Sequence, residues 1–455
     1  MSLDRRSAPE LERPIGSVAE LAAWLRAGEK APARFRVGAE YEKIGLQADS
    51  LEPVPYEGPR GIGRVLERIA ELDGWSPVEE RGALVALEKN GTSITIEPGG
   101  QLELSGFPLR TLFEVSAEFE DHLDVLRRAS EPLGLVWLGL GYSPLVPLGD
   151  APRMPRERYR IMRQYLPTRG KLALHMMHLT ATVQANVDFS DEADMVVKMR
   201  AATAVTPIVS AIFANSPLAE GRPSGFVSRR LDIWRDTDPD RCGLLHFVFD
   251  PDFGYERYVE WTLDVPMFFV VRDGTYFPTP GVTFREFLRE GWRGQRARLR
   301  DFSTHLTTLF PEVRLKQFLE VRGADAVPPD LICALPALWK GLLYDDAATA
   351  AAWALVADWP FPEREAALEA VARRGLAAEV AGRPVLPLAR ELVAIAREGL
   401  ARIGDGSGDE SDERRFLDPL QAVAERGRSP GEEVMLRWES EWERSPARLI
   451  EYARY

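Results

Sequence analysis

The chain has 455 residues, of which 45% are hydrophobic and 28% charged, and this ordinary globular composition excludes a disordered or fibrous protein. Its 70 acidic and 57 basic residues give a formal net charge of −13, which argues against general binding of nucleic acid or of an anionic membrane. Two cysteines, Cys242 and Cys333, are too few for a disulfide framework. Because no apolar signal segment and no run of 18 apolar residues is present, we expect a soluble, cytoplasmic protein.

Strands alternate with helices through the first third of the chain. The alternating segment 34–46 predicts a strand that places Glu40 and Glu42 on one face. The pair Asn90-Gly91 between two apolar runs predicts a type I′ hairpin, because both central residues of that turn need positive φ. The expected strands lie at 34–46, 83–89, 92–98, 101–106 and 134–142, and the expected helices lie at 17–27, 61–72 and 109–130.

Later in the chain the pattern changes from strands to helices. Residues 175–189 alternate cleanly, with Gln184 among the polar positions, and a helix of about two dozen residues begins near Ser190 and is kinked at Pro207. Further strands are expected at 243–249, 267–277 and 313–325, a helical region from about 329, and an acidic, glycine-rich linker at 404–413. The outline is an α+β protein: a mainly antiparallel sheet with polar side chains on one face, helices on the other face, and a helical C-terminal third.

Acidic side chains recur on the polar face of three expected strands. Residues i and i+2 of a strand share a face, so Glu40 and Glu42 can grip one cation together. Glu97 and Glu103 flank a Pro-Gly-Gly turn, and Glu320 precedes Arg322 by two positions; hard ions such as Mg²⁺ favour such oxygen ligands. An isolated E-x-E pair usually belongs to a solvated sheet face. Recurrence beside glycine-rich turns favours a metal site.

Two basic segments, 155–167 and 225–234, supply the opposite charge. The planar fork of arginine binds carboxylate or phosphate through two parallel hydrogen bonds. Interleaved tyrosines and Trp234 suit the wall of a small-molecule pocket. The alternative for each segment is an ordinary basic surface patch.

Several familiar motifs are absent. The segment TRGKL lacks the leading glycine of a phosphate-binding P-loop, since Tyr165 stands in that place, and neither Ser nor Thr follows Lys171. His175 and His178 are an odd number of residues apart on the expected strand, so they should point to opposite faces, which argues against zinc. Use of ATP would therefore need a nucleotide site of another kind.

Seven long segments carry a family resemblance. They are VGAEYEKIG, LEKNGTSITIEPGGQLELSG, RYRIMRQYLP, LTATVQANVDFSDEADM, FANSPLAEG, HLTTLFPEVRLKQFLEVRGAD and ALPALWKGLLYD. Together they resemble glutamate–cysteine ligase, in the branch found in plants and many proteobacteria, and the match runs colinearly from about residue 15 to the C-terminus. The resemblance implies a glutamine-synthetase-like fold, in which a curved antiparallel sheet forms a funnel with helices on its outer face.

The resemblance also implies a reaction. ATP phosphorylates the γ-carboxylate of L-glutamate, and the amine of L-cysteine attacks the acyl phosphate to give γ-glutamylcysteine, the first step toward glutathione. Two or three Mg²⁺ ions are expected, and Arg322 is expected to contact the transferring phosphate, with Glu42 and Glu103 acting in catalysis through the metal. Arg158, Arg230 and Trp234 are expected to bind glutamate. The expected metal ligands are Glu40, Glu42, Glu97, Glu103, Gln184 and Glu320.

Three parts are expected: an N-terminal arm and helix at 1–32, a catalytic body at 33–328, and a helical part at 329–455 packed on the same unit. The oligomer is expected to be a monomer or homodimer. Two other functions remain open: a γ-glutamyl ligase with a different amine acceptor, and a non-catalytic glutamate or nucleotide sensor. Plant members carry regulatory disulfides; here Cys333 matches one such cysteine, but Glu29 stands where its partner would be.

Overall fold

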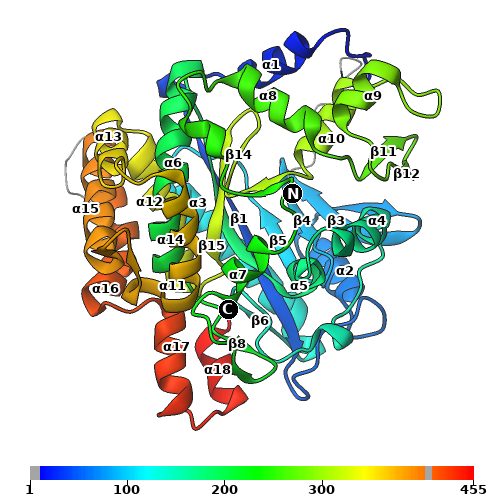
Figure 1. Ribbon diagram of the computed structural model, residues 1–455. Coiled ribbons are helices and arrows are strands. Elements are labelled where there is room, and N and C mark those ends of the chain that lie inside the picture. Colours follow the sequence, from blue (N-terminus) through cyan, green and yellow to red (C-terminus); the bar gives the residue numbers. More distant parts are fainter. Residues whose placement is uncertain (1–10, 405–411) are drawn as a thin grey trace.

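The computed structural model describes residues 11–404 and 412–455, so residues 405–411 of the acidic linker expected at 404–413 lie outside the described chain. Within the described chain, nine strands form one large sheet in the order β14-β15-β7-β1-β5-β4-β3-β2, with β6 paired to the far half of β1 (Figure 1). Every neighbouring pair in this sheet is antiparallel. The strands are β1 (Val37–Gln47), β2 (Ser76–Glu80), β3 (Ala83–Lys89), β4 (Thr92–Ile96), β5 (Leu102–Ser105), β6 (Leu135–Leu138), β7 (Thr182–Val187), β14 (Val313–Leu315) and β15 (Leu319–Asp325).

The hairpin between β3 and β4 has the turn that the sequence predicts. Asn90 and Gly91 take φ values of 49° and 86°. A type I′ turn requires positive φ at both of its central residues, and this pair meets that requirement. A second hairpin turns in the same way at Asp273 and Gly274, between β11 (Phe269–Arg272) and β12 (Thr275–Pro278). Both predicted hairpins are confirmed. The type of such a turn depends on its two central residues, so the sequence alone indicates it.

Strand β1 runs through the middle of the sheet and divides two environments. Its alternation is as predicted: Glu40 and Glu42 face a pocket, while Tyr41 packs on Phe119 of helix α3, with 4.8 Å between ring centroids. Helix α3 (Leu112–Ser130) begins at a capping box, in which Thr111 and Glu114 satisfy each other's backbone N–H groups. The helix layer also contains α2 (Ile62–Asp73), α6 (Glu192–Ile212) and α12 (Ala334–Leu343).

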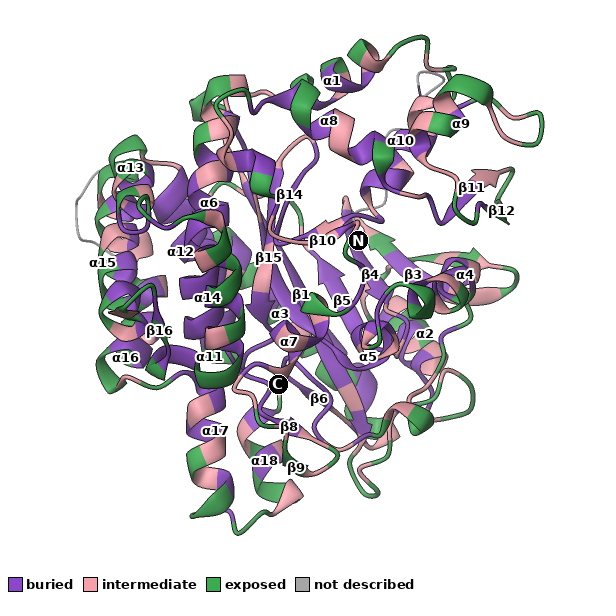
Figure 2. Ribbon diagram, in the orientation of Figure 1, coloured by how far each residue is buried: buried purple, intermediate pink, exposed green. Residues whose placement is uncertain are grey.

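Short helices lie on the pocket side. They are α4 (Glu157–Tyr165), α5 (Ala173–Leu179) and α7 (Arg229–Arg235), and the upper rim of Figure 1 holds α1 (Val18–Arg26), α8 (Tyr255–Asp264), α9 (Phe284–Glu290) and α10 (Leu299–Leu306). Two-residue pairs join β8 (Leu218–Ala219) to β9 (Arg222–Pro223) and β10 (Cys242–Gly243) to β13 (Phe310–Pro311). Strand interiors are buried and helix outer faces are exposed (Figure 2).

The C-terminal third is helical, as predicted. Its helices pack into the same continuous hydrophobic core as the sheet. Helix α6, with Pro207 inside it, is the one helix of the described chain with the length and apolar composition of a membrane span, and most of it is buried within the fold. The C-terminal elements are α11 (Pro329–Ile332), α12, α13 (Asp346–Ala354), α14 (Phe361–Arg374), β16 (Glu379–Val380), β17 (Arg383–Pro384), α15 (Val385–Ile403), α16 (Asp418–Arg426), α17 (Pro430–Glu439) and α18 (Pro446–Ala453).

Three expected strands differ from the structure. Residues 175–179 belong to helix α5, so only the later part of the expected strand 175–189 is extended. The segment 243–249 is mostly a 3₁₀ helix from His246 to Phe249. The expected strand 313–325 is a hairpin of β14 and β15, in which Lys316 N donates to Phe318 O across the turn at 2.9 Å.

Candidate active site

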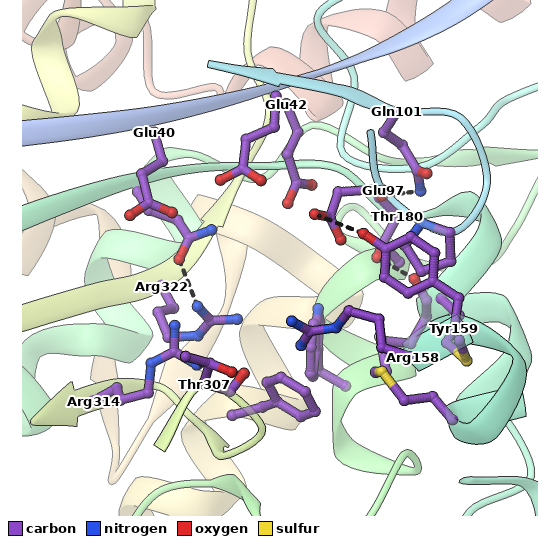
Figure 3. Close-up of a pocket in the computed structure, with 18 residues that line it drawn as sticks. Glu40, Glu42, Glu97, Gln101, Arg158, Tyr159, Thr180, Thr307, Arg314 and Arg322 are labelled. Atoms are coloured by element: carbon purple, nitrogen blue, oxygen red, sulfur yellow. Dashed lines mark hydrogen bonds between the residues drawn. The ribbon is translucent and has the colours of Figure 1, made fainter. Parts of the chain in front are cut away.

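A pocket that is partly open to solvent lies over the polar face of the main sheet (Figure 3). It is lined from the sheet by β1, β5, β7, β14 and β15, from the turn after β4, from β13, and from helices α4, α5 and α7. Eight of the ten site residues singled out from the sequence line it. The lining includes Glu40, Glu42, Glu97, Glu103, Arg158, Gln184, Trp234 and Arg322.

The carboxylates are brought together by strand register. Glu42 on β1 pairs directly with Glu103 on β5, and Glu40 pairs with Gln184 on β7. Glu103 accepts hydrogen bonds from Thr95 Oγ1 at 2.9 Å and Ser105 Oγ at 3.0 Å. Glu42 accepts one from the backbone N–H of Thr182 at 3.0 Å, and Glu40 accepts one from Asn186 Nδ2 at 3.0 Å. The sequence prediction that Glu40 and Glu42 share one face is confirmed.

Glu97 reaches the pocket from the turn after β4. The turn closes when Gly100 N donates to Glu97 O at 2.9 Å, and Gly100 takes a φ of 85°. Gly99 permits a close approach, because a Cβ there would lie 2.0 Å from His178 O. Tyr159 hydroxyl lies 3.4 Å from Glu97 Oε1 and donates more closely, at 2.7 Å, to Ile96 O.

These carboxylates are buried beside one another, and their pKa values reflect it. Burial, and next the charges of Glu97 and Glu103, raise the pKa of Glu42 well above its usual range. Burial and the charge of Glu103 raise the pKa of Glu97 to about 7. Burial is also the main cause of a raised pKa at Glu40. Burial therefore disfavours the charged forms of these three carboxylates.

Arg322 is held from two sides at the edge of this cluster. Its Nη1 donates to Gln184 Oε1 at 2.7 Å (Figure 3) and also to Glu320 Oε1 at 2.5 Å. Glu320 is fully buried and also pairs with Arg314, through two oxygens, and with Lys316 at 2.8 Å. Burial alone would raise the pKa of Glu320, but these three cations hold it well below the ordinary value. Glu320 itself does not line the pocket.

Arg158 and Trp234 line the pocket, whereas Arg230 lies directly behind the wall. The Arg230 guanidinium is 5.8 Å from the Trp234 ring centroid, and its Nη2 donates to Arg322 O at 3.0 Å. Two buried donors of helix α7, Arg230 Nε and Trp234 Nε1, have no hydrogen-bond acceptor among the described residues. An anionic ligand rich in acceptor oxygens would suit such donors.

Sequence reasoning missed part of the wall. Arg314 lines the pocket because β14 and β15 form a hairpin that places it directly opposite Glu320, and a single continuous strand could not do this. Tyr159 lies in the basic segment 155–167, so the sequence did carry a signal for this residue. The further lining residues are Pro98, Gln101, Met162, Met176, Met177, Thr180, Thr307 and Phe310, for which the sequence alone offers no signal.

His175 and His178 correct an argument from the sequence. Both lie on helix α5, where residues three apart share a face, so the strand-based reason for excluding zinc was wrong. His178 Nδ1 instead lies 3.2 Å from Pro152 O. Across the described ranges, no group of three acidic, histidine or cysteine side chains is already arranged to hold a metal ion.

The donor chemistry nevertheless fits Mg²⁺. This ion is usually held by one or two protein carboxylates, and waters and substrate phosphates complete its shell. The cross-strand pair Glu42 and Glu103 meets that need, as does Glu97 beside them. Bound cations would relieve the raised pKa values of Glu42 and Glu97.

The sheet, the carboxylates and the arginines define an enzyme that handles anionic substrates, and its class follows from its relatives. The sequence profile of glutamate-cysteine ligase family 2 (GCS2) matches residues 36–451, so the chain belongs to this family. It is 43% identical over 429 residues to the chloroplastic glutamate–cysteine ligase of Medicago truncatula, covering 94% of this chain and 83% of that protein. The chloroplastic enzyme of Arabidopsis thaliana is 43% identical over 439 residues, covering 96% and 82%.

A solved structure shows the same fold. The glutamate–cysteine ligase of Francisella tularensis, solved in complex with AMP, superposes with a TM-score of 0.54 at 13% sequence identity, covering 91% of this chain and 88% of that one. At this identity the likeness concerns the fold alone.

Proposed function

We infer that this chain catalyses the ATP-dependent joining of glutamate and cysteine to γ-glutamylcysteine, the first step of glutathione biosynthesis. The family match over residues 36–451, together with 43% identity to plant glutamate–cysteine ligases, carries this conclusion. In the finer mechanism that we propose, ATP phosphorylates the γ-carboxylate of glutamate, and the amine of cysteine then displaces phosphate from the acyl phosphate.

Glutamate binds on the α7 side of the pocket. Arg158 and Trp234 line that side, and Arg230 stands behind it with an unpartnered buried Nε. A guanidinium offers two parallel N–H groups to a carboxylate, which fixes the orientation of the substrate as well as neutralising its charge. The Trp234 ring closes the apolar side of the same space.

Glu40, Glu42, Glu97 and Glu103 are the residues that would hold Mg²⁺ in this proposal. The ion would supply positive charge that neutralises the phosphates of the reaction. Gln184 and Glu320 remain candidate ligands, but Arg322 already occupies one oxygen of each. Each would therefore exchange a hydrogen bond from Arg322 for a metal bond.

Arg322 is placed to stabilise the transferring phosphate. Gln184 and Glu320 fix its guanidinium before substrate arrives, and a preorganised cation costs no reorganisation when charge develops in the transition state. We assign no side chain of the described residues as the general base. The acyl phosphate itself or a carboxylate of the cluster can accept the proton of the amine.

The finer architecture is also part of the proposal. The main sheet is the wall of a glutamine-synthetase-like funnel, residues 33–328 form the catalytic body, and residues 329–455 support it. The protein works as a monomer or homodimer in the cytoplasm, without nucleic acid or membrane as a partner. The runner-up reaction keeps the acyl phosphate and uses another amine acceptor.

Product analysis tests this proposal. Purified protein with MgATP should release ADP only when both L-glutamate and L-cysteine are present, and mass spectrometry should identify γ-glutamylcysteine. Replacing cysteine by 2-aminobutyrate and by other amines distinguishes the two reactions. A sensor on this fold would release no ADP under any of these conditions.

A further inference from the structure

Asp325 stands outside the pocket but is linked to helix α7, which carries Arg230 and Trp234. It is the last residue of β15, pairs with Thr182 on β7, and is 2% exposed. Three donors converge on its carboxylate. They are Asn215 N at 2.8 Å and Ser216 Oγ at 2.6 Å on Oδ2, and Ser228 Oγ at 2.9 Å on Oδ1.

Both serines continue the network into helix α7. Ser228 is the N-cap of that helix, and its Oγ accepts a hydrogen bond from Leu231 N at 3.1 Å. Ser216 Oγ accepts one from the backbone N–H of Arg230, also at 3.1 Å. Asp325 thus fixes, through one hydroxyl each, the start of the helix and the backbone of Arg230.

The same carboxylate faces the Arg230 side chain. Arg230 Nη1 lies 4.0 Å from Asp325 Oδ1, and both side chains are buried. The space around the carboxylate is tight, because a Cβ at Gly141 would lie 2.4 Å from Asp325 Cγ. The acid is thus held by three donors in a tight space, and through them it ties the start of helix α7 and the backbone of Arg230 to β15.

We propose that Asp325 is a positioning residue for glutamate binding, which holds helix α7 so that Trp234 lines the pocket and Arg230 stands directly behind its wall. The inference rests on the proposed function, since it takes these two residues as contacts of the amino-acid substrate. Arg322 lies on the same strand as Asp325, and its carbonyl oxygen accepts from Arg230 Nη2, but its guanidinium is held separately by Gln184 and Glu320. The pair Glu42 and Glu103 lies on β1 and β5. The effect should therefore fall mainly on glutamate.

The variant Asp325→Asn tests this with little change of volume. The oxygen of the amide can still accept from Asn215 and Ser216, but its N–H₂ group then faces Ser228 and Arg230, where it offers a donor to a cation. We expect the dissociation constant and KM for glutamate to rise about tenfold, the effect typical of one lost charged hydrogen bond. KM for ATP and for cysteine should stay within about twofold of the wild type.

Two further variants make the result decisive. Ser216→Ala removes only the link to the Arg230 backbone and should raise the glutamate constants by a smaller factor, so it serves if Asp325→Asn does not fold. Asp188→Asn is the matched control: Asp188 follows the opposite end of β7, is also buried, and accepts from Lys30 Nζ at 2.5 Å and Arg36 N at 2.8 Å. It should lower the melting temperature and leave glutamate binding unchanged.

Glutamate binding is measured by calorimetry as well as by kinetics. Unchanged glutamate constants in folded Asp325→Asn and Ser216→Ala would overturn the inference, and so would an equal rise in the KM of all three substrates. If the wild-type protein binds glutamate but forms no γ-glutamylcysteine, the proposed reaction is refuted. The inference about Asp325 is then still tested by the measurements of glutamate binding.

Discussion

Glu42 on β1 and Glu103 on β5 are direct cross-strand partners on the pocket face of the sheet. Like charges in such a position destabilise a sheet, and neither burial nor sheet propensity explains their presence. Within the described chain, Glu42 accepts a hydrogen bond from Thr182 N but forms no ion pair. The pair fits the proposal that these carboxylates hold Mg²⁺.

The variant Glu42→Gln should separate stability from activity. Because it removes one of two repelling charges, we expect the melting temperature of the metal-free protein to stay equal or rise. The rate should fall by about 10²–10³, the typical cost of losing an electrostatic contact to the transition state. The measurements are scanning calorimetry and steady-state kinetics at saturating Mg²⁺.

Glu88→Gln is a matched control, because Glu88 is an exposed carboxylate on β3 of the same sheet. It should leave both quantities unchanged. Near-normal turnover of Glu42→Gln at ordinary Mg²⁺ concentration would contradict the assignment of Glu42.

The variant Arg230→Lys should mainly weaken glutamate binding. Lysine keeps the charge but loses the planar fork. We expect KM for glutamate to rise by the factor that corresponds to a loss of about 1.5–3 kcal/mol in binding free energy. Arg235→Lys, at the exposed end of the same helix, is the control. If KM for ATP rose instead, Arg230 would belong to the nucleotide site.

The acidic cluster predicts a pH dependence of stability in the absence of metal. The folded protein keeps a proton on Glu97 up to a pKa of about 7, whereas the unfolded chain releases it near 4.5. Between these pH values the folded state binds more protons than the unfolded chain. Glu97 therefore lowers the free energy of unfolding as pH rises, and this loss is complete above about pH 7. Added Mg²⁺ should therefore raise the melting temperature more at pH 8 than at pH 6.

Buried histidines act in the opposite direction and require a control. Burial lowers the pKa of His178 to about 4 and of His305 to about 3. Each histidine therefore makes the folded protein less stable as pH falls below 6.5. The difference between wild type and Glu97→Gln in EDTA, measured from pH 5 to 8.5, isolates the carboxylate. An equal pH slope for both proteins would show that Glu97 is ionised throughout.

Local signals allowed much of this fold to be predicted. Strand β1 and the turns at Asn90-Gly91 and Asp273-Gly274 depend on neighbouring residues, and the sequence states them directly. The turn between β14 and β15 has no glycine or asparagine, so nothing local marks it; it forms because Arg314 and Glu320 pair across it. Asp325 reaches donors about a hundred residues away, which no spacing rule could reveal.

The last prediction concerns redox control. Both Cys242 and Cys333 are free thiols, and burial raises the pKa of each, that of Cys333 to about 11. Thiolate is the reactive form in disulfide exchange, and at pH 8 only on the order of one Cys333 in a thousand would be ionised. Glu29, at the position where plant relatives would carry the partner cysteine, accepts a hydrogen bond from Tyr255 hydroxyl at 3.1 Å. We therefore expect an enzyme without an intramolecular disulfide switch.

The test compares activity after diamide with activity after dithiothreitol, alongside the mass of the intact chain. The activities should agree within about twofold, and the mass should show two free thiols, because neither thiol is ionised enough to initiate exchange. Cys333→Ser removes the thiol that matches the plant cysteine, and Cys242→Ser serves as its control. A several-fold, reversible loss of activity that disappears only in Cys333→Ser would show that this thiol does form a regulatory bond, and its partner would then have to be Cys242 or a second molecule.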